Sequence, residues 1–312
     1  MGWFGKLKKI GVVGLNGRNG AYVLPNNPRK LYPLVDDKIT TKELTQSAGL
    51  NVPELYGVFQ AQHELKRLPQ LLQTHDSFVV KPARGAGGNG ILVITGKLGP
   101  RFRKPDDSLV AEDAISFHIS NILSGMYSLG GMPDKAMVEY CVQFAPVFKN
   151  IAYQGVPDIR IIVYKGIPVM AMLRLPTRES DGKANLHQGA MGCGIDMCSG
   201  MTTSAVWKND NCTHHPDTLH PIAGVAIPDW PELLKQAALG YSVTGLGYLG
   251  VDIVLDKNLG PLILELNARP GLAIQVANKC GLQHRLDEVD RVHQDLHTET
   301  ERIQYAMDNF GS

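Results

Sequence analysis

Two consecutive strand-like runs, joined by a tight turn, constrain the fold of this chain more than any other feature. Leu249–Leu255 and Leu262–Leu266 are rich in aliphatic and β-branched residues, and the turn between them lies at Lys257–Gly260. Runs of this kind, separated by so few residues, predict an antiparallel hairpin inside a sheet. The hairpin is unusual because acidic residues interrupt its apolar strands.

These acidic residues are predicted to meet on one face of the hairpin. A turn that pairs Asp256 with Pro261 sets the register. In that register Asp252 lies opposite Glu265, and the alternation of side chains along a strand puts Asn267 on the same face. Buried carboxylates are costly unless a cation neutralises them, and an oxygen-only set without His or Cys indicates Mg²⁺ or Mn²⁺. The alternative is that each carboxylate forms a structural ion pair with a basic residue.

The rest of the chain predicts an α+β fold with an antiparallel sheet, because strand-like and helical runs are mixed and several strands adjoin. Thr40 or Thr41 is expected to cap a helix that runs to about Ala48. Further helical runs span Glu64–Leu72, Ala111–Met126 and Leu233–Tyr241. Further strand-like runs are Met137–Val142, Ile159–Tyr164 and Val169–Leu175. Residues 1–35 are expected to form a glycine- and asparagine-rich arm without a helix-length pattern. Apolar residues from Asp287 onward predict one terminal helix.

A glycine-rich stretch is the second chemically informative feature. It lies between the strand-like runs Phe78–Lys81 and Ile91–Ile94, so it is expected to form the tip of a hairpin. Lys81 and Arg84 could offer cations, and Gly87 with Gly88 could offer backbone N–H groups, to phosphate oxygens. We expect the loop 83–90 to be mobile without ligand and Lys81 to be unpaired. The alternative is a flexible hairpin tip that binds nothing.

Composition excludes several classes of protein. The 312 residues contain 31 Lys and Arg against 30 Asp and Glu, so the formal net charge is +1. This balance provides no global field for holding nucleic acid or an acidic membrane. The five cysteines are scattered and form no Cys-x-x-Cys pair, which indicates reduced thiols. The short apolar run near the N-terminus does not fit a signal peptide, and we expect a cytoplasmic protein.

Taken in order, these segments resemble the ATP-grasp superfamily, in particular the glutamate ligases of the RimK type. The resemblance extends from about Asp36 to Gly271. Its motifs, besides the acidic hairpin, are Asp37-Lys38, Gly49–Pro53, Phe78–Lys81, Glu139-Tyr140, Asp158–Arg160, Asn185–Gly189 and Arg269–Gly271. His215-Pro216 and Pro221–Trp230 also resemble a branch described as sugar-transfer-associated ATP-grasp.

The resemblance implies roles for particular residues. It implies that ATP is bound by Lys38, Lys81, Arg84, Gly87, Gly88, Glu139, Tyr140 and Asp158, and that two Mg²⁺ or Mn²⁺ ions are held by Asp252, Glu265 and Asn267. The implied catalytic residues are Arg160, Arg174, Lys183 and Asn185. Lys183 stands where the RimK-type pattern has Arg, which weakens a contact to an anionic group. Arg160 and Arg174 could instead be structural ion-pair partners.

The implied activity is an ATP-dependent carboxylate–amine ligation through an acylphosphate, with glutamate or another amino acid added to an acceptor. The alternatives are an ATP-binding regulatory subunit and a phosphotransferase. Only 37 residues precede Lys38, so the N-terminal domain common in such ligases is expected to be absent or reduced to the arm. The arm or a protein partner then takes its place, and a homodimer is possible. The implied domains are the arm 1–35, a small lobe 36–136 with the flap, a large lobe 137–286 with the metal site, and a terminal helix 287–312.

Overall fold

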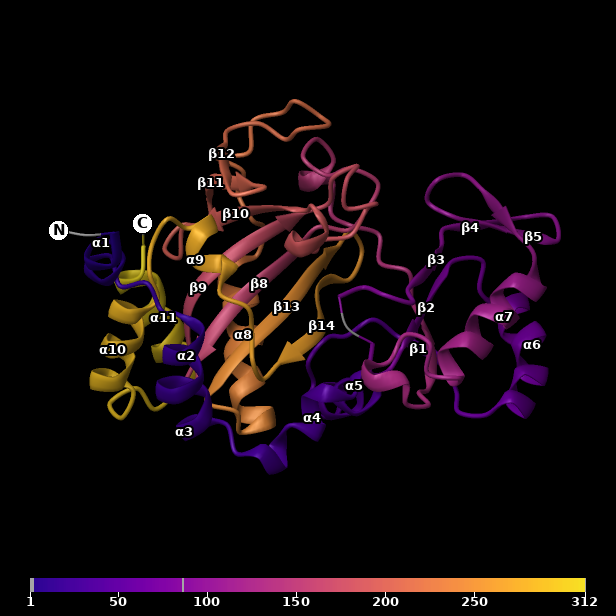
Figure 1. The fold of residues 1–312 in the computed structure, drawn as a ribbon, viewed down its shortest axis with the longest axis horizontal. Coiled ribbons are helices and arrows are strands. Elements are labelled where there is room, and N and C mark those ends of the chain that lie inside the picture. Colours follow the sequence, from indigo (N-terminus) through magenta and orange to yellow (C-terminus); the bar gives the residue numbers. More distant parts are fainter. Residues whose placement is uncertain (1–2, 86, 312) are drawn as a thin grey trace. The chain divides into compact units, whose positions relative to one another are not determined.

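The computed structural model describes residues 3–85 and 87–311, and their contacts divide the chain into two compact units (Figure 1). The first unit contains the described residues up to Asp36, the segment Glu43–Asn51 and the described residues from Gln143 onward. The second unit contains Asp37–Lys42 and Val52–Val142. Both units combine helices with antiparallel strands, so the chain has the α+β architecture that the sequence predicts.

The first unit is built on a seven-stranded sheet in the order β12-β11-β10-β9-β8-β13-β14, and every pairing in it is antiparallel. The strands are β8 (Asp158–Tyr164), β9 (Ile167–Leu175), β10 (Met191–Ile195), β11 (Thr202–Trp207), β12 (Asp210–Cys212), β13 (Tyr248–Asp256) and β14 (Gly260–Asn267). The sequence predicts β8, β9, β13 and β14. It misses β10 to β12, because short runs such as Met-Gly-Cys-Gly-Ile contain glycines that weaken a strand pattern.

The hairpin of β13 and β14 confirms the predicted pairing of its acidic residues, although the turn differs. Asp256 pairs with Gly260 rather than with Pro261, so the register at the turn is one residue away from the prediction. A bulge between Asp252 and Ile253 shifts the register back, and Asp252 lies opposite Glu265. An extra residue in one strand is what a β-bulge inserts, and it re-aims the side chains beyond it.

Helix α8 (Trp230–Thr244) packs against β8, β9, β13 and β14. A methyl group added at Gly240 would come within 2.9 Å of Leu249 and 3.5 Å of Val251, so these two residues of β13 face the helix. Because side chains alternate along a strand, Gly250 and Asp252 face the opposite side of the sheet. The helix therefore covers one face and leaves the acidic residues on the other.

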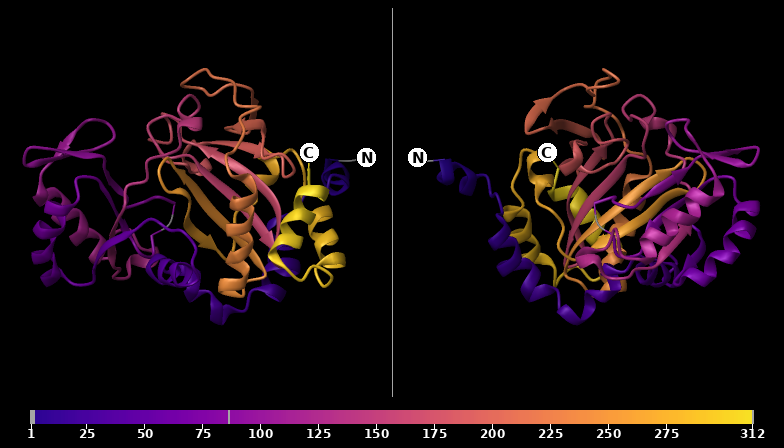
Figure 2. Two further views of the ribbon diagram at one scale, coloured as in Figure 1. Left: turned by 180° about the vertical axis from the view of Figure 1, so that it is seen from behind. Right: turned by 45° about the vertical axis from the view of Figure 1, so that its right-hand side comes forward.

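The C-terminal region contains two helices, α10 (Gln283–Val292) and α11 (Glu299–Asn309), so the expectation of a single helix is wrong. Thr298 begins α11 with a capping box: its side chain accepts a hydrogen bond from the backbone N–H of Glu301, whose carboxylate accepts one from Thr298 N. The apolar periodicity alone predicts one continuous helix, whereas this cap begins a second helix after Thr298. Helix α11 packs against α8 and β9 (Figure 2).

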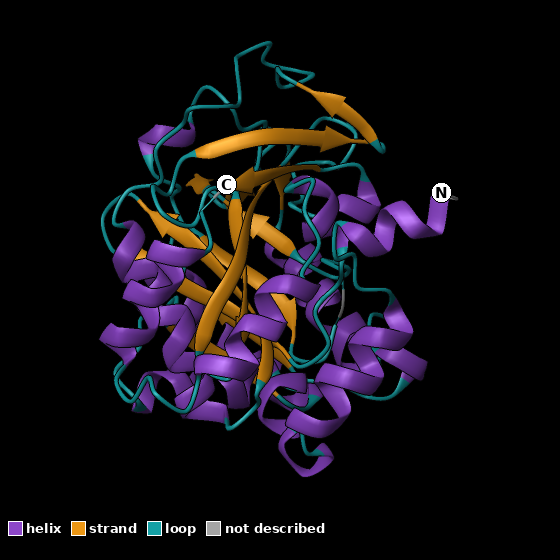
Figure 3. Ribbon diagram, turned by 90° about the vertical axis from the view of Figure 1, so that its left-hand side faces the viewer, coloured by secondary structure: helices purple, strands orange, loops and turns teal. Residues whose placement is uncertain are grey.

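The N-terminal arm is more helical than its composition predicts, and this expectation also needs correction (Figure 3). It forms α1 (Trp3–Lys9), α2 (Leu15–Gly17), a π-helical turn (Arg18–Val23), α3 (Leu24–Asn26), a 3₁₀ turn (Arg29–Leu31) and α4 (Pro33–Asp36). Several residues of the arm are buried in the first unit, among them Val13, Tyr22 and Val23. Tertiary contacts therefore stabilise helical turns that the local sequence does not favour.

The second unit has a four-stranded sheet in the order β1-β7-β2-β3 and a small sheet in the order β4-β5-β6. The strands are β1 (Leu55–Phe59), β2 (Phe78–Pro82), β3 (Leu92–Ile94), β4 (Gly96–Leu98), β5 (Arg101–Arg103), β6 (Leu109–Val110) and β7 (Ala136–Glu139). The antiparallel pairing of β2 with β3 confirms the predicted hairpin around the glycine-rich loop. Helices α6 (Leu68–Thr74) and α7 (Glu112–Leu123) pack on its core, which includes Phe59, Phe78 and Ile119.

Helix α5 (Lys38–Ser47) begins three or four residues earlier than a cap at Thr40 or Thr41 predicts. The Asp37 carboxylate accepts hydrogen bonds from the backbone N–H groups of Ile39 and Thr40, at 3.0 and 3.3 Å. Asp37 therefore satisfies the free N–H groups of the first turn, a role predicted for Thr40 or Thr41. Gly49 follows the helix with a φ of 76°, as expected for a residue that ends one.

Helix α7 ends at Leu123, and Met126, predicted on its apolar face, is 63% exposed. Within residues 3–85 and 87–311, no helix combines the length and the apolar character needed to cross a bilayer.

The capping box predicts a stability difference between two neighbouring threonines. Thr298→Ala should lower the free energy of unfolding by about 1 kcal/mol, because the N–H groups of the first turn of α11 lose their acceptor. Thr300→Ala, at an exposed position inside the helix, should leave stability unchanged or raise it slightly. Urea unfolding of both variants measures the difference. Equal stability of the two variants would show that no helix starts at Thr298.

Candidate active site

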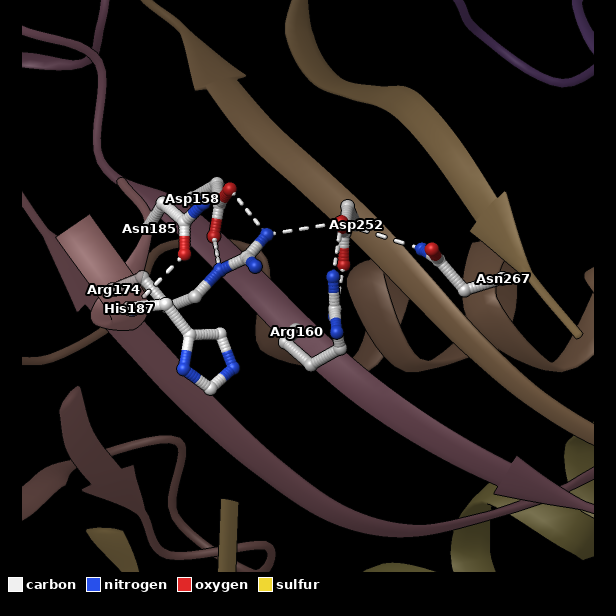
Figure 4. Close-up of polar contacts among 7 residues, drawn as sticks. All are labelled: Asp158, Arg160, Arg174, Asn185, His187, Asp252 and Asn267. Carbon is white, nitrogen blue, oxygen red and sulfur yellow. Dashed lines mark hydrogen bonds and ion pairs between the residues drawn. The ribbon is translucent and has the colours of Figure 1, made fainter. Parts of the chain in front are cut away.

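Four charged side chains meet on the face of the first unit's sheet that α8 leaves open (Figure 4). Asp158 and Arg160 lie on β8, Arg174 on β9 and Asp252 on β13. The Arg160 guanidinium donates to both oxygens of Asp252, with 2.6 Å between Nη2 and Oδ2. Arg174 donates to both oxygens of Asp158 and also contacts Asp252, with 2.9 Å between Nη2 and Oδ2. The result is a continuous chain of alternating charges.

The strand register brings these residues together. Asp252 pairs with Arg160 across β13 and β8, and Asp158 pairs with Arg174 across β8 and β9. Directly paired residues have their side chains on the same face of a sheet, within reach of each other. Gly250 precedes this row, and a methyl group there would lie 2.5 Å from Pro270 and 3.5 Å from Arg160. The absence of a side chain at Gly250 thus lets the segment after β14 approach the site.

Burial and charge act in opposite directions on the two carboxylates. Burial raises the pKa of Asp252, but the guanidinium groups of Arg160 and Arg174 outweigh it and hold the pKa at about 2. Burial raises the pKa of Asp158 to about 6 against the attraction of Arg174, and the nearby charge of Asp252 adds to the rise. For Arg174, the two carboxylates outweigh burial and raise the pKa. Asp252 is therefore the carboxylate that these arginines hold ionised most strongly.

The metal set predicted from the sequence lies along β13 and β14. Asn267 is within 3.4 Å of Asp252, from its side-chain nitrogen to Oδ2, so the two side chains share a face. Glu265 lies opposite Asp252 in the register and is half-buried. Two carboxylates and an amide suit Mg²⁺ or Mn²⁺ in chemical type. In the described ranges, no group of three or more His, Cys, Asp or Glu side chains is arranged to hold an ion, and Asp252 is bonded to two arginines.

A second charged cluster lies in the second unit, where three residues are almost fully buried. Glu139 on β7 contacts Lys81 on β2 at 2.5 Å and Lys42 on α5 at 2.8 Å. The backbone carbonyl of Pro53 also accepts from Lys42. Burial raises the pKa of Glu139, yet the two lysines outweigh it and lower that pKa below its usual value. Burial lowers the pKa of Lys42 despite the attraction of Glu139.

This cluster corrects one expectation and adds a residue. Lys81 is paired, contrary to the expectation of a free cation. Lys42 was missed, although it lies one helical turn after Lys38. A helix predicted to begin at Thr40 or Thr41 leaves Lys38 outside it, whereas in α5 residues four apart share a face.

The glycine-rich loop is held at its N-terminal end by polar contacts. Lys38 Nζ donates to the carbonyl of Gly85 at 2.7 Å, and Arg84 Nε donates to Asp37 at 3.3 Å. Gly87 and Gly88 have φ values of 66° and 78°, which side chains rarely adopt. Ala86, inside the predicted flap, lies outside the described residues. The mobility of the flap stays a prediction.

Three other predicted residues, Tyr140, Asn185 and Lys183, make further polar contacts. Tyr140 donates its backbone N–H to the carbonyl of Glu54. Asn185 accepts a hydrogen bond from the backbone N–H of His187 and caps a 3₁₀ turn (Figure 4). Lys183 is 4.0 Å from Asp181. Their roles in substrate binding stay predictions.

Known proteins similar to this chain identify its family. Residues 17–291 match the family described as sugar-transfer associated ATP-grasp, so the chain belongs to that family. A probable alpha-L-glutamate ligase of Maridesulfovibrio salexigens is 30% identical over 115 residues, which are 37% of this chain and 27% of that protein. The chain therefore spans about a quarter of the length of this relative.

Solved structures of ligases are also similar. The ATP-grasp ligase PsnB, complexed with a minimal precursor, is 16% identical and has a TM-score of 0.48, covering 86% of this chain and 63% of its own. D-alanine–D-alanine ligase from Bacillus anthracis, complexed with ATP, is 12% identical and has a TM-score of 0.46, covering 90% of this chain and 67% of its own.

The ion pair of Lys81 predicts a loss of stability. Lys81→Met should lower the free energy of unfolding by about 3 kcal/mol, because a buried carboxylate then keeps one cation instead of two. Lys66→Met, at an exposed position of the same unit, is the matched control and should have no measurable effect. Denaturant unfolding of both variants provides the comparison. An unchanged stability of Lys81→Met would mean that Glu139 does not depend on this lysine.

The lowered pKa of Glu139 predicts how stability responds to acid. A carboxyl group with a lower pKa in the folded state stabilises the fold above pH 4.5, its ordinary pKa, and this contribution is lost as pH falls through the folded value. Glu139→Gln cannot titrate. The difference in unfolding free energy between wild type and Glu139→Gln should therefore shrink from pH 6 to pH 3. A constant difference over this range would contradict the assigned ion pairs.

Proposed function

We propose that this protein is an ATP-dependent carboxylate–amine ligase that forms an amide bond. A substrate carboxylate oxygen attacks the γ-phosphorus of ATP and ADP leaves, which yields an acylphosphate. An amine then attacks the acyl carbon, phosphate leaves, and the amine loses a proton. Membership of the sugar-transfer-associated ATP-grasp family supports ATP as the phosphoryl donor.

The observation that carries this proposal is the alternating row of Asp158, Arg174, Asp252 and Arg160 on one face of the sheet. Planar guanidinium groups bind carboxylates and phosphoryl oxygens through two parallel hydrogen bonds. In the proposed reaction Arg160 and Arg174 orient the substrate carboxylate and balance the charge on the transferred phosphoryl group. Their present partners hold both guanidiniums within the site until an anionic ligand competes for them.

The residues that would hold divalent cations are Asp252, Glu265 and Asn267. When bound, Mg²⁺ would supply charge neutralisation at the phosphate oxygens. Arg160 and Arg174, which both pair with the Asp252 carboxylate, would share it with such an ion. The proposed role of Asp252 is thus twofold, as metal ligand and as anchor of the arginines.

Lys81 is proposed to be the principal phosphate-binding cation of the second unit. Glu139, at 2.5 Å, fixes its ammonium group, and Lys42 supplies the second charge that keeps Glu139 ionised. Lys38, Arg84 and the N–H groups of Gly87 and Gly88 extend this set toward a phosphate chain. Glu139, whose side chain pairs with the lysines, and Tyr140 are the proposed contacts to the adenine.

The proposed donor is an amino acid, and glutamate is the first to test. The similar protein from Maridesulfovibrio salexigens, named a probable alpha-L-glutamate ligase, supports this choice. Lys183 and Asn185, in the loop before β10, are the proposed contacts to the amino-acid substrate. Lysine instead of arginine at 183 favours a single point contact over a bidentate one.

The experiment is a screen for ADP release with Mg²⁺-ATP, amino acids and amine acceptors, followed by the mass of the product. A product heavier by one amino-acid residue supports ligation, whereas one heavier by a phosphoryl group indicates a phosphotransferase. ATP binding without any product indicates a regulatory subunit. Either of these last two outcomes overturns the proposal.

The same assay tests the role of Asp252 in the alternating row. Asp252→Asn should lower kcat about a hundredfold or more, because the arginines and the cation lose their common carboxylate. Asp210→Asn, at an exposed position of β12, is the control and should retain activity. Activity of Asp252→Asn close to that of the control would remove Asp252 from the mechanism.

A further inference from the structure

The N-terminal arm contacts the three residues that directly follow Asn267. Asn27 donates from Nδ2 to the carbonyl of Ala268 at 2.8 Å. Arg18 donates from Nη1 to the carbonyls of Pro270, at 2.7 Å, and Arg269, at 3.4 Å. Residues about 240 to 250 positions apart in the chain thus meet, and three consecutive backbone carbonyls receive side-chain donors from one segment.

Both donors are buried and are themselves held in place. Arg18 is 8% exposed, and its Nε and Nη2 donate to the side chain of Asn19 at 3.1 and 2.9 Å. Asn27 is 2% exposed, donates to the carbonyl of Tyr248 at 2.7 Å, and accepts from the backbone N–H of Tyr248 at 2.9 Å. Asn27 therefore joins the start of β13 to the end of β14, the two strands of the acidic hairpin.

Aromatic contacts anchor the arm on the same part of the sheet. Tyr22 packs against Tyr164 and Tyr248, with ring centroids 5.6 and 6.2 Å apart. The guanidinium of Arg269 lies over the ring of Tyr32, 5.2 Å from its centroid. Ring stacking and cation–π contacts of this kind stabilise a docked segment. These contacts thus fix the arm between Arg18 and Asn27 and again after Asn27.

The contacted segment borders the proposed metal site. Ala268 follows Asn267 directly, and Pro270 lies against Gly250, whose position also borders Arg160. A displacement of residues 268–270 would move Asn267 at one end of the segment. At the other end it would move Pro270, which packs beside Gly250 and Arg160. Groups that orient metal ligands tune metal affinity even though they do not touch the ion.

We propose that Arg18 and Asn27 are positioning residues, which fix the segment Ala268–Pro270 and thereby hold Asn267 in place for the divalent cation. Their carbonyl acceptors are fixed backbone groups, so the loss of either donor leaves buried polar oxygens without a partner and loosens the segment. Because Asn267 is a metal ligand only in the proposed function, the roles of Arg18 and Asn27 rest on that function.

The experiment compares Arg18→Met, Arg18→Lys and Asn27→Ala with wild type in three measurements. These are the dissociation constant of Mn²⁺ by calorimetry, hydrogen exchange of the amides of residues 267–271, and kcat and KM for ATP. Lys30→Met, which removes an exposed positive charge from the same arm, is the matched control. All measurements are made on the full chain at a temperature where each variant is folded by circular dichroism.

Arg18→Met and Asn27→Ala should raise the dissociation constant of Mn²⁺ about tenfold and speed exchange at residues 267–271. Arg18→Lys should recover part of the affinity, because an ammonium can still donate to one carbonyl. Lys30→Met should match wild type. If the variants are less stable but bind Mn²⁺ with wild-type affinity, the arm is only a structural brace and the inference is wrong.

The outcomes also separate this inference from the proposed function. If the wild-type protein binds Mn²⁺ and ATP but makes no amide, the proposed ligation is refuted. The Mn²⁺ affinities of the variants then still decide the role of Arg18 and Asn27. Wild type that does not bind Mn²⁺ overturns the metal site and this inference together.

Discussion

The ion pairs around Asp252 are the interaction on which the rest of the site depends. A buried carboxylate in the middle of a sheet is costly, and two guanidinium groups offset that cost here. The second unit solves the same problem in the same way, since two lysines surround the buried Glu139. In both places one acid fixes two long basic side chains, which would otherwise lose rotamer entropy on binding an anion. Each unit thus holds two basic side chains in place around one buried carboxylate.

This arrangement links stability to chemistry. Arg160 and Arg174, which neutralise Asp252, and Lys81, one of the two lysines that neutralise Glu139, are the groups proposed to bind substrate and nucleotide. In the proposed function an anionic ligand competes with a carboxylate for each of them, so that binding exchanges one charge-assisted hydrogen bond for another. The N-terminal arm adds a second constraint, because it fixes the end of β14 that follows Asn267. Preorganised groups reduce the reorganisation that a reaction requires.

Much of the fold and of the candidate site could be predicted from local sequence patterns. The hairpins of β2 with β3 and β13 with β14 follow from apolar runs separated by short or glycine-rich turns. The pairing of Asp252 with Glu265 was predicted from a register that is wrong at the turn, and a bulge restores it. The predicted start of α5 was wrong, and so was the prediction of one continuous C-terminal helix. In both cases a polar side chain caps a helix, which apolar periodicity does not record.

The sequence by itself determined the α+β class, the strands β8, β9, β13 and β14, the acidic hairpin, the glycine-rich loop and the resemblance to ATP-grasp proteins. These depend on residue types and spacings within short segments, where backbone preferences and side-chain alternation act locally. Only the tertiary structure decided the partner of each charge. Arg160 and Asp252 are 92 positions apart, and Arg18 meets Pro270 across 252 positions. Such contacts depend on which strands become neighbours and where the arm docks, and both are set by packing of the whole unit.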